Sequence, residues 1–380
     1  MVEFTVDSES RKQVVDSYLS KEFTLIIKGV AVILLLSHHL WAFPERLPGS
    51  ITGITDYVFR GSLLIAGDFG RICVAVFASL SGYGKYIKYA DKKINTFRDI
   101  RKMYFLYWRV FLIFIPVAFI FFRNQMPYCQ DEMVYSCYKV FSVRELVLNF
   151  FGLLSTYNRE WWFLSTYIIC TAMFPLIRKM ADKLSVLMYV FIVLCFQLAF
   201  LMLDRTGIFK LNDIADNIFK YLMPYVVCFC SGVLIAKRAV YSFIAEKTAK
   251  LRFKPLLSLG LIILVFVLRE VLSMLTLEFL FVILFVYALR MLLPDTVRIN
   301  KIFAFLGRYS SYMWLTHSFF CYYFGIAAKS IVFFKWSLIT LLILTGYSLA
   351  ASVLIDFIWN SIDRGCVKIA EHFHVSRRDE

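Results

Sequence analysis

The chain has 380 residues, of which 60% are hydrophobic and 18% are charged, and its formal net charge is +15. Soluble domains carry roughly a quarter of charged residues, so this composition excludes an ordinary soluble protein and indicates an integral membrane protein. The excess of Lys and Arg then fits cytoplasmic loops of a membrane protein, and we expect no nucleic-acid partner.

Apolar runs long enough to cross a bilayer, which takes about 17–25 residues, recur along the whole chain. They predict an all-α fold, a polytopic transmembrane bundle of about ten helices. The runs lie at about 24–42, 67–86, 103–122, 161–180, 184–203, 217–236, 255–272, 274–293, 302–326 and 336–359. The seventh and eighth form one apolar stretch interrupted at Arg269-Glu270, which we interpret as a tight hairpin.

Lys and Arg concentrate in every second connection between these runs, which predicts that both termini are cytoplasmic. The chain then divides into a cytoplasmic segment 1–23, a transmembrane domain 24–360 and a cytoplasmic tail 361–380. The outer segment at about 123–160 is expected to pack over the bundle as a partial lid. It contains Cys129 and Cys137, and a disulfide between them is possible because the outside is oxidising.

The first apolar run, KGVAVILLLSHHLW, carries Lys28 near one end and His38 and His39 near the other. In an α-helix Lys28 and His39 are about 20° apart around the axis and about 16 Å apart along it, so they share one face. His38 points about 80° away. Two interpretations remain open here: Lys28 reaches the inner headgroups and the histidines lie at the outer interface, or the face is functional.

Four motifs in order identify the chain as similar to a known family. They are Lys28-Gly29 followed by His39 in the first run, VAVFASLSGYGKYI with Ser81-Gly82-Tyr83 in the second, REWWFLSTYI in the fourth, and FLGRYSSYMWLTHSFF with His317 in the ninth. This ordered set resembles the acyltransferase 3 family of bacterial membrane-bound O-acyltransferases. Two positions depart from the family pattern, since Lys28 stands in place of the usual arginine and Ala75 in place of an acidic residue.

The resemblance implies transfer of an acyl group, usually acetyl, from cytoplasmic acyl-CoA to a hydroxyl of a cell-envelope carbohydrate. The expected location is the bacterial cytoplasmic membrane, and the expected partners are the bilayer, acyl-CoA and the carbohydrate acceptor, with no metal. His39 is the expected general base because an imidazole titrates near working pH, and His38 is the second choice. Lys28 is expected to bind the CoA phosphates. A covalent acyl-histidine or acyl-serine relay, a succinyl donor and several kinds of glycan remain alternatives.

Further ionisable residues within the runs are candidates for contacts with the substrates. Arg109 is expected to contact a phosphate or the thioester carbonyl, or else to pair with Asp356 or to reach the lipid headgroups. Arg71 is expected to contact the glycan, or else to pair with Asp68.

The fourth and ninth runs add four candidates. Glu160 either orients a catalytic histidine or merely interacts with the helix dipole. Trp161 and Trp162 either contact sugar faces or belong to an interfacial belt of aromatic residues. His317 either takes part in catalysis or makes an interhelical hydrogen bond.

A transporter or flippase for a charged envelope precursor is the competing class, because interior charges in ten helices fit it too. Such proteins commonly show repeated halves and helices interrupted at matching positions. Neither feature is evident in this sequence, which favours the enzyme.

Overall fold

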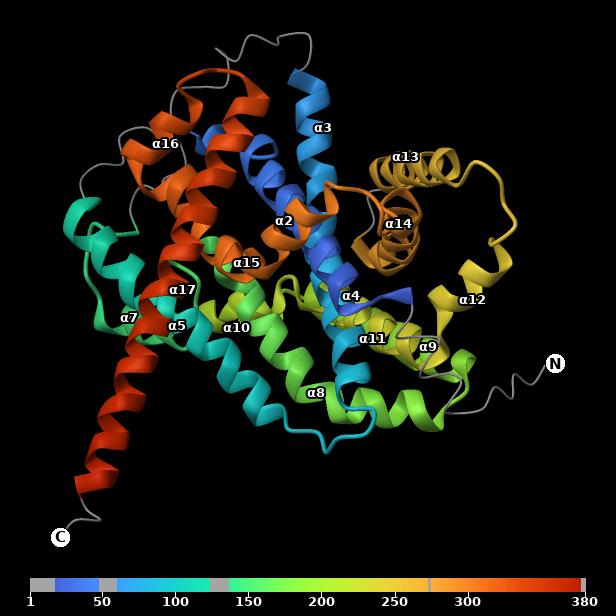
Figure 1. The fold of residues 1–380 in the computed structure, drawn as a ribbon, viewed down its shortest axis with the longest axis horizontal. Helices are drawn as coiled ribbons and strands as arrows, with labels where there is room; N and C mark the ends of the chain where they lie inside the picture. Colours follow the sequence, from blue (N-terminus) through green and yellow to red (C-terminus); the bar gives the residue numbers. More distant parts are fainter. Residues whose placement is uncertain (1–17, 48–59, 124–136, 273–274, 377–380) are drawn as a thin grey trace.

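The computed structural model describes residues 18–47, 60–123, 137–272 and 275–376, and every regular element in these ranges is a helix (Figure 1). The predicted all-α bundle is therefore confirmed. The principal helices are α2 (Lys21–Trp41), α3 (Arg60–Gly70), α4 (Ile72–Lys88), α5 (Thr96–Phe121), α7 (Val143–Phe150), α8 (Phe163–Lys183), α9 (Val186–Arg205), α10 (Asp213–Phe219), α11 (Leu222–Arg238), α12 (Val240–Lys247), α13 (Lys254–Leu272), α14 (Glu278–Leu292), α15 (Asn300–Ser318), α16 (Gly325–Val332) and α17 (Ser337–Ser376).

Within the described residues, eight helical stretches are long and apolar enough to cross a membrane. Two further predicted runs, 274–293 and 302–326, correspond to α14 and α15. At 15 residues α14 is short for a span. In α15, several polar side chains are buried inside the bundle, including Ser310, Thr316 and His317. The last helix, α17, runs past the predicted domain end at 360 and extends beyond the bundle (Figure 1).

Glycines at two helix crossings allow the central helices to pack backbone against backbone. At the α2–α15 crossing, a Cβ on Gly29 would lie 2.0 Å from the Phe303 carbonyl oxygen, and one on Gly307 would lie 1.9 Å from that of Leu25. Small residues permit such close approaches between membrane helices. Gly29 and Gly307 each belong to one of the four motifs. Because neither has a side chain, the backbones of α2 and α15 can come into contact.

The α4–α11 crossing is built in the same reciprocal way, with a Cβ on Gly82 lying 2.1 Å from the Phe229 carbonyl oxygen. We expect Gly82→Ala to lower the free energy of unfolding by about 1–3 kcal/mol, because the two helices must separate. Gly84→Ala is the matched control on the same helix, since a Cβ there meets nothing within 4 Å. Melting of both variants in detergent checks this; equal midpoints would contradict it.

The seventh and eighth predicted runs form a hairpin, α13 and α14, but Arg269 and Glu270 do not make its turn, because both residues lie in the last turn of α13. The Arg269 side chain is buried, and its Nη2 lies 2.7 Å from Glu278 Oε1 at the start of α14. Its Nη1 also donates to the backbone oxygens of Asp68 and Phe69, at 2.9 and 3.1 Å. The buried Arg269–Glu278 pair therefore connects the α13–α14 hairpin to the end of α3, where the chain breaks before α4.

Residues 137–160, the described part of the segment that we call the outer segment, pack against α5, and the partial lid stays a prediction. The Tyr107 hydroxyl donates to the Asn149 carbonyl at 2.6 Å, and the Trp108 indole donates to that of Phe150 at 2.8 Å. Cys129 lies outside the described residues, so the suggested disulfide stays a prediction. Through these bonds, α7 and the turn after it are held beside the central helices, where they form one wall of a cavity.

Candidate functional site

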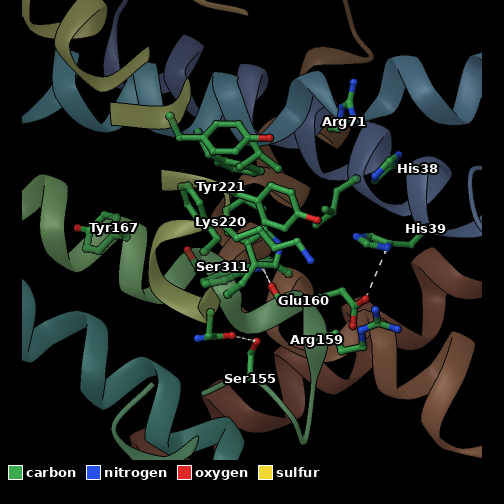
Figure 2. A pocket seen from close by; sticks show the side chains of 18 of the residues that line it. His38, His39, Arg71, Ser155, Arg159, Glu160, Tyr167, Lys220, Tyr221 and Ser311 are labelled. Carbon is green, nitrogen blue, oxygen red and sulfur yellow. Dashed lines mark hydrogen bonds and ion pairs between the residues drawn. The ribbon is translucent and has the colours of Figure 1, made fainter. Parts of the chain in front are cut away.

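A cavity of about 960 Å³ lies inside the bundle, lined by residues from α2, α4, α8, α10, α11 and α15 and from the outer segment (Figure 2). Lys28, His38 and His39 of α2 all line it. The predicted shared face of this helix thus borders one space, which extends from Lys28 to His39 and on to polar residues of the outer segment and α10. Among the residues predicted for the site, Glu160, Arg71 and Trp162 also line it.

His39 lies among three groups that are distant from it in the sequence. Its Nδ1 is 4.0 Å from Glu160 Oε1 and 3.5 Å from the Tyr322 hydroxyl (Figure 2 shows the first of these). Its ring centroid is 4.8 Å from that of His317. An imidazole beside a carboxylate can accept a proton. The distance to Glu160 is longer than a hydrogen bond, but catalytic hydrogen bonds often shorten only when the substrate binds.

Glu160 is held in place by a short 3₁₀ helix, Arg159–Trp162, just before α8. The Asn158 side chain caps this turn and also bonds to Ser318 Oγ at 2.7 Å. The Trp314 indole donates to the Glu160 carbonyl at 3.1 Å. One carboxylate oxygen, Oε2, is buried without a hydrogen-bond partner among the described residues. A buried acceptor of this kind normally has a partner, so Oε2 is available to a hydrogen-bond donor of a ligand or of a water molecule.

Arg46 and Tyr322 belong to this cluster and were not predicted. Arg46 Nη1 donates to Glu160 Oε1 at 2.8 Å, and the guanidinium carbon lies 3.9 Å from the Tyr322 ring centroid. Burial alone would lower the pKa of Arg46, but the Glu160 carboxylate outweighs it and the pKa is raised, so Arg46 stays charged. Its turn, Pro44–Arg46, gives no sequence signal that separates it from an interfacial loop.

Tyr322 reaches the cluster because the chain after α15 forms a π-helical segment, Phe319–Tyr323. The Tyr322 hydroxyl donates to the His39 carbonyl oxygen. Single π turns are rare and occur often at functional sites. In the sequence, this segment continues the ninth apolar run with further aromatic residues. No sequence pattern therefore predicted the π-helical turn or the position of Tyr322.

The other two histidines have different surroundings. His38 lines the cavity, and its Nδ1 is 2.8 Å from the Gly67 carbonyl oxygen on α3. The backbone around Gly67 and Gly70 approaches α2 closely there. His317 is fully buried, its Nδ1 lies 2.7 Å from the Trp314 carbonyl, and its Nε2 has no partner among the described residues. Of these three histidines, only His39 both lines the cavity and lies within 4.0 Å of a carboxylate oxygen.

Lys28 is half-buried and lines the cavity, and no described residue gives it a hydrogen bond or an ion pair. Ser81, Ser310 and Ser311 line the same cavity. A partly buried cation without a counter-ion is costly, so the position is suited to an anionic ligand. Arg71 likewise lines the cavity, and its buried Nε has no partner among the described residues.

Three predicted site residues do not line the cavity: His317, described above, Arg109 and Trp161. Arg109 Nη2 lies 2.6 Å from Asp363 on α17, and its Nη1 donates to the Tyr312 hydroxyl at 3.3 Å. Its counter-ion is therefore Asp363 rather than the suggested Asp356. Trp161 is buried in the core, with its indole donating to the Leu315 carbonyl at 3.0 Å. Among the described residues, no cluster of His, Cys, Asp or Glu could hold a metal ion.

The family model described as an acyltransferase domain, of the acyltransferase 3 family, matches residues 26–357. No curated protein and no solved structure matches the chain significantly.

Proposed function

Because the chain belongs to the acyltransferase 3 family, whose model covers residues 26–357, we propose that it transfers an acyl group, most simply acetyl, from cytoplasmic acyl-CoA to a hydroxyl of a cell-envelope carbohydrate. The chain is a multi-pass membrane protein, and we place it in the bacterial cytoplasmic membrane with the start of α2 facing the cytoplasm. The observation that carries the proposal is the single cavity shared by Lys28, His39 and Glu160.

Lys28 has the position and the charge to bind the phosphates of the donor. It lies about 16 Å from His39 along α2, which is comparable to the extended length of the pantetheine arm. The thioester of a CoA molecule held at Lys28 would then reach His39 through the cavity, and the nucleotide would not have to cross the membrane. Arg109 is left out of this donor site because it pairs with Asp363 away from the cavity.

His39 acts as the general base in this proposal. It takes the proton from the acceptor hydroxyl while the hydroxyl oxygen attacks the thioester carbonyl carbon. The tetrahedral intermediate then collapses with cleavage of the C–S bond, and the proton passes to the leaving CoA thiolate. Glu160 orients the imidazole and stabilises its protonated form, as a carboxylate does in other base–carboxylate pairs, and Arg46 holds Glu160 in position.

Replacement of Lys28 tests the donor site. We expect Lys28→Ala to raise the KM for acetyl-CoA about tenfold or more, because a charged contact to a phosphate is lost. Lys28→Arg should retain most of the affinity, and Lys21→Ala is the matched control because Lys21 is exposed on the same helix. Thiol release from acetyl-CoA by purified protein in detergent, with the CoA-induced rise in melting temperature, measures the effect. An unchanged KM would refute the role of Lys28.

The same assay tests the proposed function as a whole. Wild-type protein that neither releases thiol from acetyl-CoA nor is stabilised by CoA would contradict it. Concentrative uptake of an envelope precursor into proteoliposomes, without acylation, would support the transporter instead.

A further inference from the structure

The part of the cavity away from Lys28 has a different lining, which the proposed chemistry at His39 does not use. Five aromatic side chains line it in a continuous series of neighbouring rings: Tyr221, Trp162, Tyr225, Phe163 and Trp314. Successive ring centroids in this order are 5.1, 5.4, 6.2 and 5.7 Å apart. They come from three parts of the chain: the start of α8, the start of α11 and α15.

This aromatic series ends beside Glu160 and His39. Trp314, at one end, donates its indole hydrogen to the Glu160 carbonyl, and Glu160 lies 4.0 Å from His39. Tyr221, at the other end, adjoins Lys220 (Figure 2) and is 39% exposed, and we call this end of the cavity the rim. A ring-shaped ligand stacked on these side chains would thus lie between the rim and the proposed general base.

Several polar groups of the series have no partner in the protein. Tyr225 is only 3% exposed, yet its hydroxyl forms no hydrogen bond with any described residue. The same holds, among the described residues, for the Trp162 indole nitrogen and the Tyr221 hydroxyl. All three side chains line the cavity, and the Tyr221 side chain is 39% exposed. Their hydroxyl and indole groups are therefore free to form hydrogen bonds with the hydroxyls of a ligand.

The rim next to Tyr221 adds amide and hydroxyl groups in a fixed arrangement. The Ser155 hydroxyl donates to Asn217 Oδ1 at 2.5 Å, and the Asn217 amide donates to the Leu153 carbonyl at 3.0 Å. Asp216 and Lys220 also line the cavity here, and no described residue forms a side-chain ion pair with either. Charges of both signs at the rim favour neither an anionic nor a cationic ligand.

We propose that this aromatic series is the acceptor site, and that it binds a pyranose ring of a carbohydrate with one hydroxyl directed to His39. The flat apolar faces of the sugar pack on Trp162 and Tyr225, and its hydroxyls bond to the unpartnered phenol and indole groups. This inference rests on the proposed function and deepens it, because it assigns the acceptor to the end of the cavity opposite Lys28. The donor and the acceptor then approach His39 from opposite directions.

Binding of sugars to the purified full-length protein in detergent tests the site without any acyl transfer. The probes are methyl glycosides of glucose, galactose and N-acetylglucosamine and their β-linked disaccharides, titrated against tryptophan fluorescence. We expect at least one probe to quench the fluorescence, and the quenching to be reduced in Trp162→Phe. Tyr225→Phe, which keeps the ring and removes one hydrogen-bonding group, should weaken binding about five- to tenfold.

Tyr309→Phe is the matched control, since Tyr309 is on α15 but does not line the cavity. A melting curve for each variant shows whether it is folded. The best-bound probe then serves as acceptor with acetyl-CoA, and we expect Tyr225→Phe to raise the KM for the sugar more than the KM for acetyl-CoA.

The possible failures can be told apart. Turnover of acetyl-CoA together with unchanged sugar binding in Trp162→Phe and Tyr225→Phe would overturn the acceptor site and leave the proposed function intact. Binding of none of the probes would also overturn it. Sugar binding that depends on Trp162, in a protein that does not use acetyl-CoA, would keep the site and overturn the acyl transfer.

Discussion

Replacement of His39 by alanine is expected to lower acyl transfer about 10²–10⁴-fold, the range that a general base contributes. The imidazole lines the cavity beside Glu160, and no other described histidine combines these two features. The fold should survive, because His39 lines the cavity and does not lie at the close helix contacts made by Gly29 and Gly82. Rates of transfer from acetyl-CoA, with melting curves on the same samples, measure the effect.

His38→Gln is the comparison for this experiment. Its Nδ1 bonds to the Gly67 carbonyl and its ring neighbours that of His39, so we expect a less than tenfold loss of activity. If His38→Gln abolished transfer and His39→Ala retained it, the general base would be His38. If both variants retained full activity, neither histidine would be the base and the proposed mechanism would be wrong.

Removal of the Arg269 charge is expected to destabilise the protein by about 3–5 kcal/mol, because it leaves a buried carboxylate without a counter-ion. Side chains of Arg269 and Glu278 are 4% and 3% exposed, and three hydrogen bonds join them. Arg269→Met should therefore lower the melting temperature in detergent. It should also loosen the α3–α4 break, because the backbone oxygens of Asp68 and Phe69 lose their donor.

The double variant Arg269→Met with Glu278→Leu separates the two causes. Replacing both members of a buried ion pair by apolar residues is often neutral, so the double variant should regain much of the lost stability. Part of the loss should remain, since the two bonds to the α3 backbone are still absent. A double variant no more stable than Arg269→Met alone would show that the ion pair is not the source of the effect.

Several residues of the candidate site were proposed from the sequence, but Arg46 and Tyr322 were not. Lys28 and His39 lie on one helix, so the helical repeat alone placed them on a common face, and both line the cavity. Glu160 and Trp162 were found through a charged residue beside two tryptophans at the start of a span. Arg46 and Tyr322 were missed because each acquires its position from contacts between segments far apart in the chain.

Predictions for charges inside helices were less successful, for a related reason. The sequence shows that Arg109 and Arg269 need partners, since an ionised group in a membrane interior is costly. It does not show which carboxylate supplies the partner. Arg109 pairs with Asp363 rather than Asp356, and Arg269 pairs with Glu278 across the α13–α14 hairpin, whose turn Arg269 had been expected to form.

The sequence alone determined that this is an all-helical membrane protein of the acyltransferase 3 type, because span length, hydropathy and the order of four motifs are properties of the linear chain. The tertiary structure decided which polar side chains line the same cavity, that the aromatic series ends beside Glu160, and which charged residues pair between helices. The physical reason is that periodicity fixes neighbours along one helix, whereas neighbours on different helices are fixed by packing, here by glycines such as Gly29 and Gly82 that let helix backbones touch.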